Sequence, residues 1–253
     1  MLGCGTSVGV PMLGCHCAVC DGGHPRNQRT RSSVLLQLPG GNLLIDTTPE
    51  MRLQLLREKI DCVNAVVYTH YHVDHLFGLD DCRVFPKFLG GALPLYCTDE
   101  VEAVIRSAFS YAFDSGTEDL PPGFLPKLDF HRIDPRPFTV LGETITPIPL
   151  MHSHFKVMGF RIGNLAYCTD VSLIPDTSLE RLAGLDTLIL DALRPHRPHP
   201  SHFCIEQALE VFEQLKPRRM ILTHMSHEID YDTLKATLPV GVEPGYDGLT
   251  VNF

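Results

Sequence analysis

The segment VVYTHYHVDH holds the residues with the greatest potential for chemistry, and it begins with β-branched residues. Three histidines and an aspartate fall within six positions, at His70, His72, Asp74 and His75. Imidazole nitrogens and carboxylate oxygens suit zinc, manganese or iron, and a set rich in both suits a pair of ions. His70 and His72 are two residues apart, so an extended or tightly looped segment directs both at one ion. Asp74 and His75 follow and could bind a second ion, whereas solvated surface histidines would not need such clustering.

Several predicted strands end on a residue that can bind a metal or transfer a proton. In mixed α/β sheets, ligands collect where strands end and open into loops. Each ion needs more ligands than the histidine segment supplies, and other strand ends offer His152, Asp170 and His224. The complete set of strand-end residues is Asp46, His70, His152, Asp170, Asp191 and His224.

Short apolar segments alternate with amphipathic ones, which predicts an α/β fold. One helix is predicted to begin at an N-cap at Thr48 with Pro49 as its first residue, and to bury Leu53, Leu56 and Ile60. The predicted strands are 32–38, 42–46, 65–70, 146–152, 165–170, 187–193, 219–225 and 248–253.

Two further helices are predicted after Thr98 and after Ser201, because apolar residues recur there at helical spacing. The segment 115–137 is rich in proline, glycine and acidic residues, and it is predicted to form a long irregular loop.

Composition limits the class of protein. With 253 residues, of which 44% are hydrophobic, the chain can bury the core of a single domain. No apolar run approaches the roughly 20 residues that cross a bilayer, so no membrane contact is expected. Nine cysteines without a secretory signal predict a reducing, cytoplasmic compartment. A net charge of −9 argues against a broad nucleic-acid surface. The sequence leaves open whether the chain forms a homodimer.

A second cluster lies in GCHCAVC, where Cys15, Cys17 and Cys20 could surround one ion with three thiolates. A closed tetrahedral zinc site needs a fourth ligand. We choose His227, which follows His224 by three residues in THMSHEID. Such a site would be structural, because it would tie the N-terminal loop to the C-terminal segment. A disulfide or free thiols are the alternatives. The other candidate histidines are His16 and His24.

The segment THYHVDH closely resembles the T-H-x-H-x-D-H signature of metallo-β-lactamase-fold hydrolases, and the likeness extends over nearly the whole chain. The resemblance implies a four-layer αββα sandwich with two mixed sheets and outer helices. It also implies hydrolysis by metal-activated water, with Asp46 bracing the histidine loop. By this resemblance one ion is held by His70, His72 and His152, and the other by Asp74, His75 and His224, with Asp170 between them.

A narrower likeness concerns both ends of the chain. GTSVGVPMLGCHCAVC resembles the N-terminal region of the phosphoribosyl 1,2-cyclic phosphate phosphodiesterases, and LPVGVEPGYDGLTV resembles their ending. This implies one structural zinc and two active-site ions, zinc or manganese. It implies a small cyclic or nucleotide-like phosphate ester as substrate. Only Met1 and Leu2 precede the glycine-rich loop, so the first strand of the single domain, 1–253, is expected to be truncated.

Cleavage of a phosphodiester also requires a proton for the leaving alkoxide. His202 is predicted to lie one residue past the Ser201 cap and to open the third helix, whose N-terminus favours an anion. It also resembles the family's catalytic or phosphate-contacting histidine. Asp74 is the other candidate, although a metal ligand is stabilised as an anion.

Other functions compete with the phosphodiesterase. A tRNA 3′-end endonuclease of this fold carries a long RNA-binding arm, but only 17 residues separate His152 from Asp170 here, which is room for one hairpin. A thioester hydrolase of this fold is a further alternative. A metal-binding accessory protein without catalysis is the alternative from outside enzymology.

Overall fold

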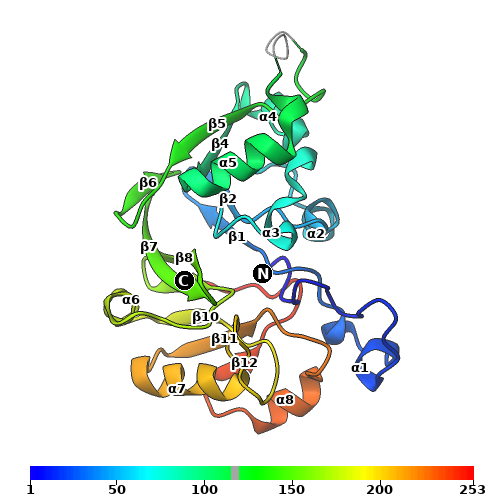
Figure 1. Cartoon of the computed structure of the whole chain (residues 1–253), viewed down its shortest axis with the longest axis vertical. Coiled ribbons are helices and arrows are strands. Elements are labelled where there is room, and N and C mark those ends of the chain that lie inside the picture. The colour runs from blue at the N-terminus through cyan, green and yellow to red at the C-terminus, as the bar shows by residue number, and fades with distance from the viewer. Residues whose placement is uncertain (115–119) are drawn as a thin grey trace.

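The computed structural model, which describes residues 1–114 and 120–253, consists of two facing β-sheets with helices on their outer sides (Figure 1). The first sheet has the order β1 (Val34–Leu38), β2 (Gly41–Ile45), β3 (Ala65–Val67), β4 (Leu93–Cys97) and β5 (Leu128–Arg132). The second has the order β12 (Val242–Pro244), β11 (Arg219–Thr223), β10 (Thr187–Asp191), β9 (Leu165–Cys168), β8 (Phe155–Ile162), β7 (Glu143–His152) and β6 (Phe138–Val140).

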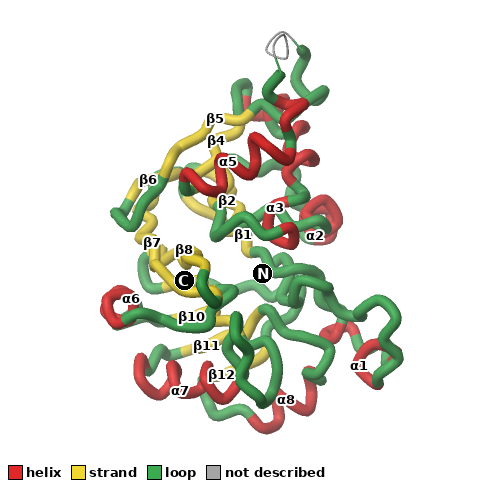
Figure 2. Tube along the Cα trace, viewed as in Figure 1, coloured by secondary structure: helices red, strands yellow, loops and turns green. Residues whose placement is uncertain are grey.

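The helices are short and follow the strands. The α-helices are α1 (Ala18–Asp21), α2 (Met51–Arg57), α3 (Val73–Leu76), α4 (Pro86–Leu89), α5 (Asp99–Ala108), α6 (Asp176–Arg181), α7 (Ile205–Leu215) and α8 (Tyr231–Thr237). The 3₁₀ helices are η1 (Pro25–Asn27), η2 (Leu79–Val84) and η3 (Ser110–Ala112). None of the helices in the described ranges is long and apolar enough to cross a membrane. Much of the chain before β1 is loop (Figure 2), and it extends into a projecting lobe that contains α1.

Both sheets are mixed. β1 pairs antiparallel with β2, whereas β2 through β5 are parallel. In the second sheet β6 through β9 are antiparallel and β9 through β12 are parallel. Parallel strands bring their carboxyl ends to one edge of a sheet, where loops can form a site. The predicted sandwich of two mixed sheets between helices is confirmed.

Three hydrophobic clusters fill the spaces between the four layers. Side chains alternate along β2, so that Leu43 and Ile45 pack in the cluster between the sheets and Leu44 packs in the cluster beneath the helices. Phe160 of β8 is completely buried in the cluster between the sheets. α2 and α5 cover the outer side of the first sheet, and α7 covers the second. Apolar packing therefore holds the two sheets face to face.

One predicted strand is wrong and several strands were not predicted. Residues 248–253 form no strand, because Gly248 adopts a φ of 90° and the segment bonds to the chain start instead. The nitrogen of Met1 donates to the carbonyl of Leu249, and the nitrogen of Gly248 donates to the carbonyl of Met1. The unpredicted strands are β4, β5, β6, β8 and β12.

The helix predicted from Thr48 starts later and buries a different face. α2 begins at Met51, and Leu53 and Leu56 are each 59% exposed. Gln54 is buried in their place, with its Nε2 donating to the hydroxyl of Thr30 at 2.8 Å. A buried amide with a partner across the fold thus sets the orientation of this helix, which hydrophobic spacing alone does not reveal.

Two other predictions concern the middle of the chain. The helix predicted after Thr98 is α5, with Thr98 at its N-cap and with Val101 and Ile105 buried. The predicted irregular loop of 115–137 lies partly outside the described residues, at 115–119. Its later part is not irregular, because 128–132 form β5, which pairs in parallel with β4.

Truncation of Phe160 tests the packing between the sheets. Phe160→Ala should lower the free energy of unfolding by about 3–5 kcal/mol, because it leaves a cavity in the inter-sheet core. Phe88→Ala is the control, since that ring is 65% exposed on α4 and its loss should cost less than about 0.5 kcal/mol. Urea denaturation followed by circular dichroism measures both values. Equal losses in the two variants would contradict this account of the core.

Candidate metal centre

The polar strand ends converge at one edge of the sandwich. Asp46, Asp170 and His224, which directly follow or closely follow β2, β9 and β11, have left-handed φ angles of 65°, 57° and 57°. Residues other than glycine rarely adopt this conformation, and it concentrates at functional sites. The chain therefore turns sharply where each of these strands stops, and it leaves the side chain at the sheet edge.

The first group of candidate ligands consists of His70, His72 and His152. One ring nitrogen from each lies within 4.8 Å of the others. His70 follows β3, His72 is the N-cap of α3, and His152 ends β7. Burial lowers the pKa of all three histidines, which favours neutral imidazole. Neutral imidazole is the form that binds metal ions.

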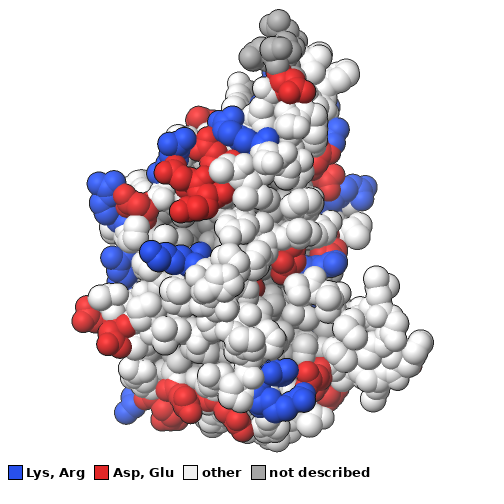
Figure 3. Space-filling view, in the orientation of Figure 1, with Lys and Arg blue, Asp and Glu red and all other residues white. Residues whose placement is uncertain are grey.

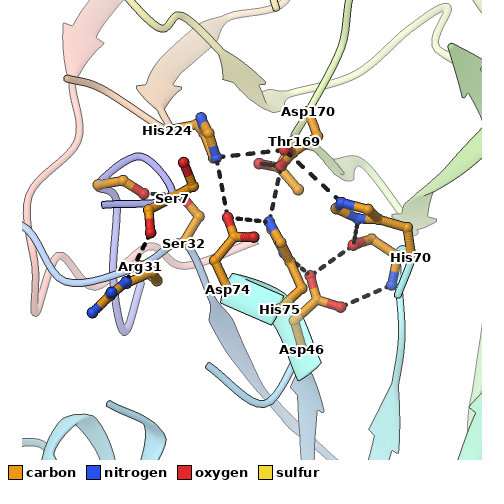
Figure 4. A network of polar contacts seen from close by, with 12 residues as sticks. Ser7, Arg31, Ser32, Asp46, His70, Asp74, His75, Thr169, Asp170 and His224 are labelled. Carbon is orange, nitrogen blue, oxygen red and sulfur yellow. Dashed lines mark hydrogen bonds and ion pairs between the residues drawn. The ribbon is translucent and has the colours of Figure 1, made fainter. Parts of the chain in front are cut away.

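The second group consists of Asp74, His75, Asp170 and His224, all buried (Figure 4). The Nε2 atom of His75 lies 3.3 Å from a carboxylate oxygen of Asp74 and 3.1 Å from one of Asp170. The Nε2 atom of His224 lies 3.7 Å and 3.4 Å from the same two carboxylates. Asp74 and His75 belong to the short helix α3, so one turn of helix supplies two members.

Asp170 lies between the two groups. Its Oδ1 atom is 4.0 Å from the Nε2 atoms of both His70 and His152 and 3.4 Å from that of His224. Its Oδ2 atom faces His75. A single carboxylate is therefore placed to face both members of a pair of ions.

The electrostatics of the second group call for a cation. Burial opposes ionisation of Asp74, yet the adjacent His75 and His224 hold the pKa of its carboxyl group below the ordinary value. Burial also opposes protonation of His224, but Asp170 and Asp74 raise the pKa of that imidazole to about 9. The two buried carboxylates thus draw positive charge into the site, and a divalent ion would supply it in place of the imidazole protons.

Ring nitrogens without partners test whether ions fit here. The Nε2 atoms of His70, His75 and His224 are buried. Oxygens of Asp170 lie 4.0, 3.1 and 3.4 Å from them, but none of the three atoms makes a hydrogen bond among the described residues. Buried polar atoms in this condition are rare in folded proteins. Imidazole and carboxylate donors are a common ligand set for zinc, manganese and iron. The two groups therefore fit a pair of divalent metal ions.

Asp46 orients the histidines without belonging to either group. Its Oδ2 accepts hydrogen bonds from His75 Nδ1 and from the Thr69 hydroxyl, each at 2.8 Å, and its Oδ1 accepts from the Thr69 nitrogen. The Thr69 hydroxyl lies 2.9 Å from His70 Nδ1. Such bonds fix each ring and leave its Nε2 available to a metal ion. This contact pattern agrees with the bracing role expected from the sequence.

His202 lies beside the candidate ligands and is held by Asp191. Its Nδ1 donates to Asp191 Oδ2 at 2.9 Å, and its ring centre is 4.6 Å from that of His224 and 4.7 Å from that of His152. The other oxygen of Asp191 lies 3.8 Å from His224 Nδ1. The sequence analysis places Asp191 among the polar strand ends but does not identify His202 as its partner.

The predicted position of His202 at the start of a helix is wrong. α7 begins at Ile205 with Cys204 as its N-cap, and the Cys204 nitrogen donates to Gln207 Oε1. The chain before it bonds backward, with the Leu193 nitrogen donating to the carbonyl of Phe203. These loop hydrogen bonds delay the helix, so His202 lies in the preceding loop.

The thiolate cluster lies in the projecting lobe, which shows no charged residues on the face in Figure 3. Donor atoms of Cys15, Cys17, Cys20 and His227 lie within 4.8 Å of one another. The hydrogen bond from His227 lowers the pKa of Cys17 to about 6, and burial raises that of Cys20 to about 11. Four such donors suit a closed zinc site. The other candidates contact carboxylates instead, with His16 beside Asp21 and His24 beside Asp232.

A buried arginine, which the sequence analysis did not identify, holds the segment between the two clusters. Arg29 is 1% exposed, and its NH1 group donates to the carbonyl of Ser226 at 3.2 Å. Ser226 lies between His224 and His227, so the segment that serves both clusters is fastened to the N-terminal region.

A cavity of about 710 Å³ lies elsewhere, between β1 and the C-terminal residues 248–253. None of the candidate ligands lines it. We therefore assign the chemistry to the polar sheet edge and not to this cavity.

Comparison with known proteins agrees with this geometry. The model of the beta-lactamase superfamily domain matches residues 41–225, which is most of the chain. The chain belongs to the beta-lactamase superfamily. The family resemblance expected from the histidine segment is thereby confirmed, and superfamily membership with these two groups supports a metal-dependent hydrolase.

Individual relatives differ in sequence identity to this chain and in the length that they share with it. The chain is 42% identical to a diphosphatase of the PhnP family, with a TM-score of 0.90 and coverage of 98% of this chain and 93% of the other. It is 36% identical to an octanoyltransferase of Porphyromonas gingivalis over 98% of this chain, but spans only half the length of that relative. A ribonuclease Z of Pyrobaculum neutrophilum is 24% identical over 88% of this chain and 90% of its own.

Metal analysis tests the two clusters separately. The purified, metal-replete protein should hold close to three ions per chain, two among the histidines and aspartates and one among the thiolates. Cys17→Ser should lose one ion and keep two, because it removes one of four thiolate-site donors. Cys62→Ser is the control, since that partly buried thiol belongs to neither cluster and should leave the count unchanged. Mass spectrometry of dissolved metals gives the counts, and an unchanged count in Cys17→Ser would refute the structural site.

Proposed function

We propose that the chain is a dinuclear-metal phosphodiesterase that hydrolyses a small phosphate ester. The observation that carries this proposal is Asp170, which faces both ligand groups while the pair of His202 and Asp191 lies beside them. The similarity to a PhnP-family diphosphatase over nearly the whole chain supports phosphoryl chemistry.

Each of the two ligand groups would hold one metal ion. When bound, two divalent ions supply Lewis acidity toward a phosphoryl oxygen and a nucleophilic water for in-line displacement. The protein orients the inward nitrogens of His70, His75 and His152 through a second contact on the same ring. His75 donates to Asp46, and His152 donates from its Nδ1 to the carbonyl of Ser201 at 2.8 Å. The site is therefore preorganised, which limits rearrangement during the reaction.

His202 is the proposed proton donor to the leaving oxygen. Its Nδ1 is occupied by Asp191, so Nε2 is the nitrogen available to the substrate. A carboxylate in this position fixes the orientation of the ring, as in other acid–base pairs. Asp74 is less suited to the task because it belongs to a metal-binding group, where binding an ion keeps it ionised.

A small substrate is favoured over tRNA. The described residues between His152 and Asp170 form β8, its turns and β9, which are parts of the sheet and not an extended arm. The net charge of −9 also disfavours a surface that follows a phosphate backbone. The ribonuclease Z relative is less similar to this chain than the diphosphatase is.

Thioester hydrolysis is the second candidate function. The specific observation in its favour is the octanoyltransferase of P. gingivalis, which matches 98% of this chain with half of its own length. An octanoyl thioester is the substrate class that this relation suggests. The same ions could polarise the carbonyl group of a thioester.

Removal of the proposed proton donor tests its role. His202→Ala should keep both active-site ions but lose about a hundredfold or more of kcat on a phosphodiester with a poor leaving group. His196→Ala is the control, since that exposed histidine pairs with Glu206 and belongs to neither ligand group. Metal content and turnover are measured on the same samples. Wild-type turnover in His202→Ala would show that the donor has been assigned to the wrong residue.

A direct substrate comparison tests the proposed function itself. Metal-loaded protein should hydrolyse bis-p-nitrophenyl phosphate, and stripping the metals should abolish this activity. Octanoyl-N-acetylcysteamine is the matched thioester probe. Faster hydrolysis of the thioester would favour the second candidate, and inactivity on both with full metal loading would favour a metal-binding accessory protein.

A further inference from the structure

The tip of the β7–β8 hairpin lies at the rim of the metal centre. His152 at the end of β7 pairs with Phe155 at the start of β8, and only Ser153 and His154 connect them. Ser153 has a left-handed φ of 57°, and its nitrogen donates to Ser172 Oγ at 2.8 Å. The tip is therefore fixed in place directly after a candidate ligand.

Aromatic rings gather around this tip. The Phe155 ring centre lies 5.7 Å from that of His72 at an interplanar angle of 81°, and 3.9 Å from that of His154. The Tyr71 ring lies 6.2 Å from Phe155 and 5.7 Å from His72. We name Tyr71, His154 and Phe155 the aromatic shelf.

The aromatic shelf is open to solvent where the metal centre is not. His154 is exposed, and Tyr71 and Phe155 are partly exposed, as is the candidate ligand His72 that they adjoin. The other candidate ligands are buried. His72 therefore joins the aromatic shelf to the first ligand group, and a molecule reaching the ions on that side would meet these rings.

The arginines of the flanking loops are already engaged. Arg194 donates to the carbonyls of Arg197 and Pro198, and Arg197 pairs with Glu228 at 2.9 Å. Arg31 pairs with Glu50 and donates to the carbonyl of Ser7. These guanidinium groups are therefore not free to bind a second anionic group of a substrate. The aromatic rings, in contrast, are available to a planar group.

We propose that the aromatic shelf binds a planar ring carried on the phosphate ester, which makes Phe155 a specificity-determining residue. This inference rests on the proposed function, because it places the phosphoryl group at the metal centre. Offset or edge-to-face packing of a heteroaromatic ring against Phe155 and Tyr71 supplies the selectivity. The substrate class is then a nucleoside or aryl phosphate ester.

Binding of two matched ligands tests the aromatic shelf without requiring turnover. Adenosine 5′-monophosphate and ribose 5-phosphate share the phosphorylated sugar and differ at C1′, which carries adenine in the first and a hydroxyl group in the second. Calorimetry on metal-loaded wild-type protein should show about tenfold tighter binding of the nucleotide. Phe155→Leu keeps apolar bulk and the backbone pairing with His152 but removes the ring. This variant should reduce the ratio of the two affinities to nearly one and leave the affinity for ribose 5-phosphate unchanged.

The ratio of the two affinities separates recognition from folding. Phe88→Leu, at an exposed ring on α4, is the control and should keep the wild-type ratio. A wild-type protein without preference, or a Phe155→Leu variant that keeps it, would overturn the aromatic shelf while leaving the proposed phosphodiesterase intact. Failure of the metal-loaded protein to bind either ligand would count against the phosphoryl site itself, and the inference would fall with it.

Discussion

The structure depends on burying two carboxylates among five imidazoles at the junction of two sheets. Asp74 and Asp170 are 9% and 2% exposed. Burying charged carboxylates this deeply is costly unless opposite charges lie beside them. Among the described residues the inward nitrogens of His70, His75 and His224 find no hydrogen-bond partner. Divalent ions would satisfy both conditions together, since they neutralise the carboxylates and take the free electron pairs of the nitrogens. Metal binding would then contribute to folding stability as well as to chemistry.

The backbone and the outer contacts build this arrangement before any ligand is bound. Sharp turns at Asp46, Asp170 and His224 end the strands at one edge. Outside the ligand groups, Asp46 and Asp191 each hold a histidine by its Nδ1 atom. The Arg29 contact and the thiolate cluster fasten the segment 224–227 from the other side. The inward rings of His70, His75 and His152 are thus each supported by a second hydrogen bond, which is how precise sites are maintained on a scaffold.

Sequence patterns identified what depends on local order. The H-x-H-x-D-H spacing and the polar strand ends brought seven candidate ligands to attention, and the structure places all of them in two adjoining groups. The face of α2 was mispredicted, because Gln54 has a partner distant in sequence. The start of α7 and the pairing of Asp191 with His202 depend on how a loop folds back on the sheet. Hydrophobic periodicity carries no information about such contacts, since tertiary partners override local propensity.

Anomalous X-ray diffraction from crystals of metal-loaded protein tests the central claim most directly. We predict two strong peaks, one between His70, His72 and His152 and the other beside Asp74, His75 and His224, with Asp170 between them. A single peak, or none, in this region of a fully loaded protein with its imidazoles turned outward would contradict the account.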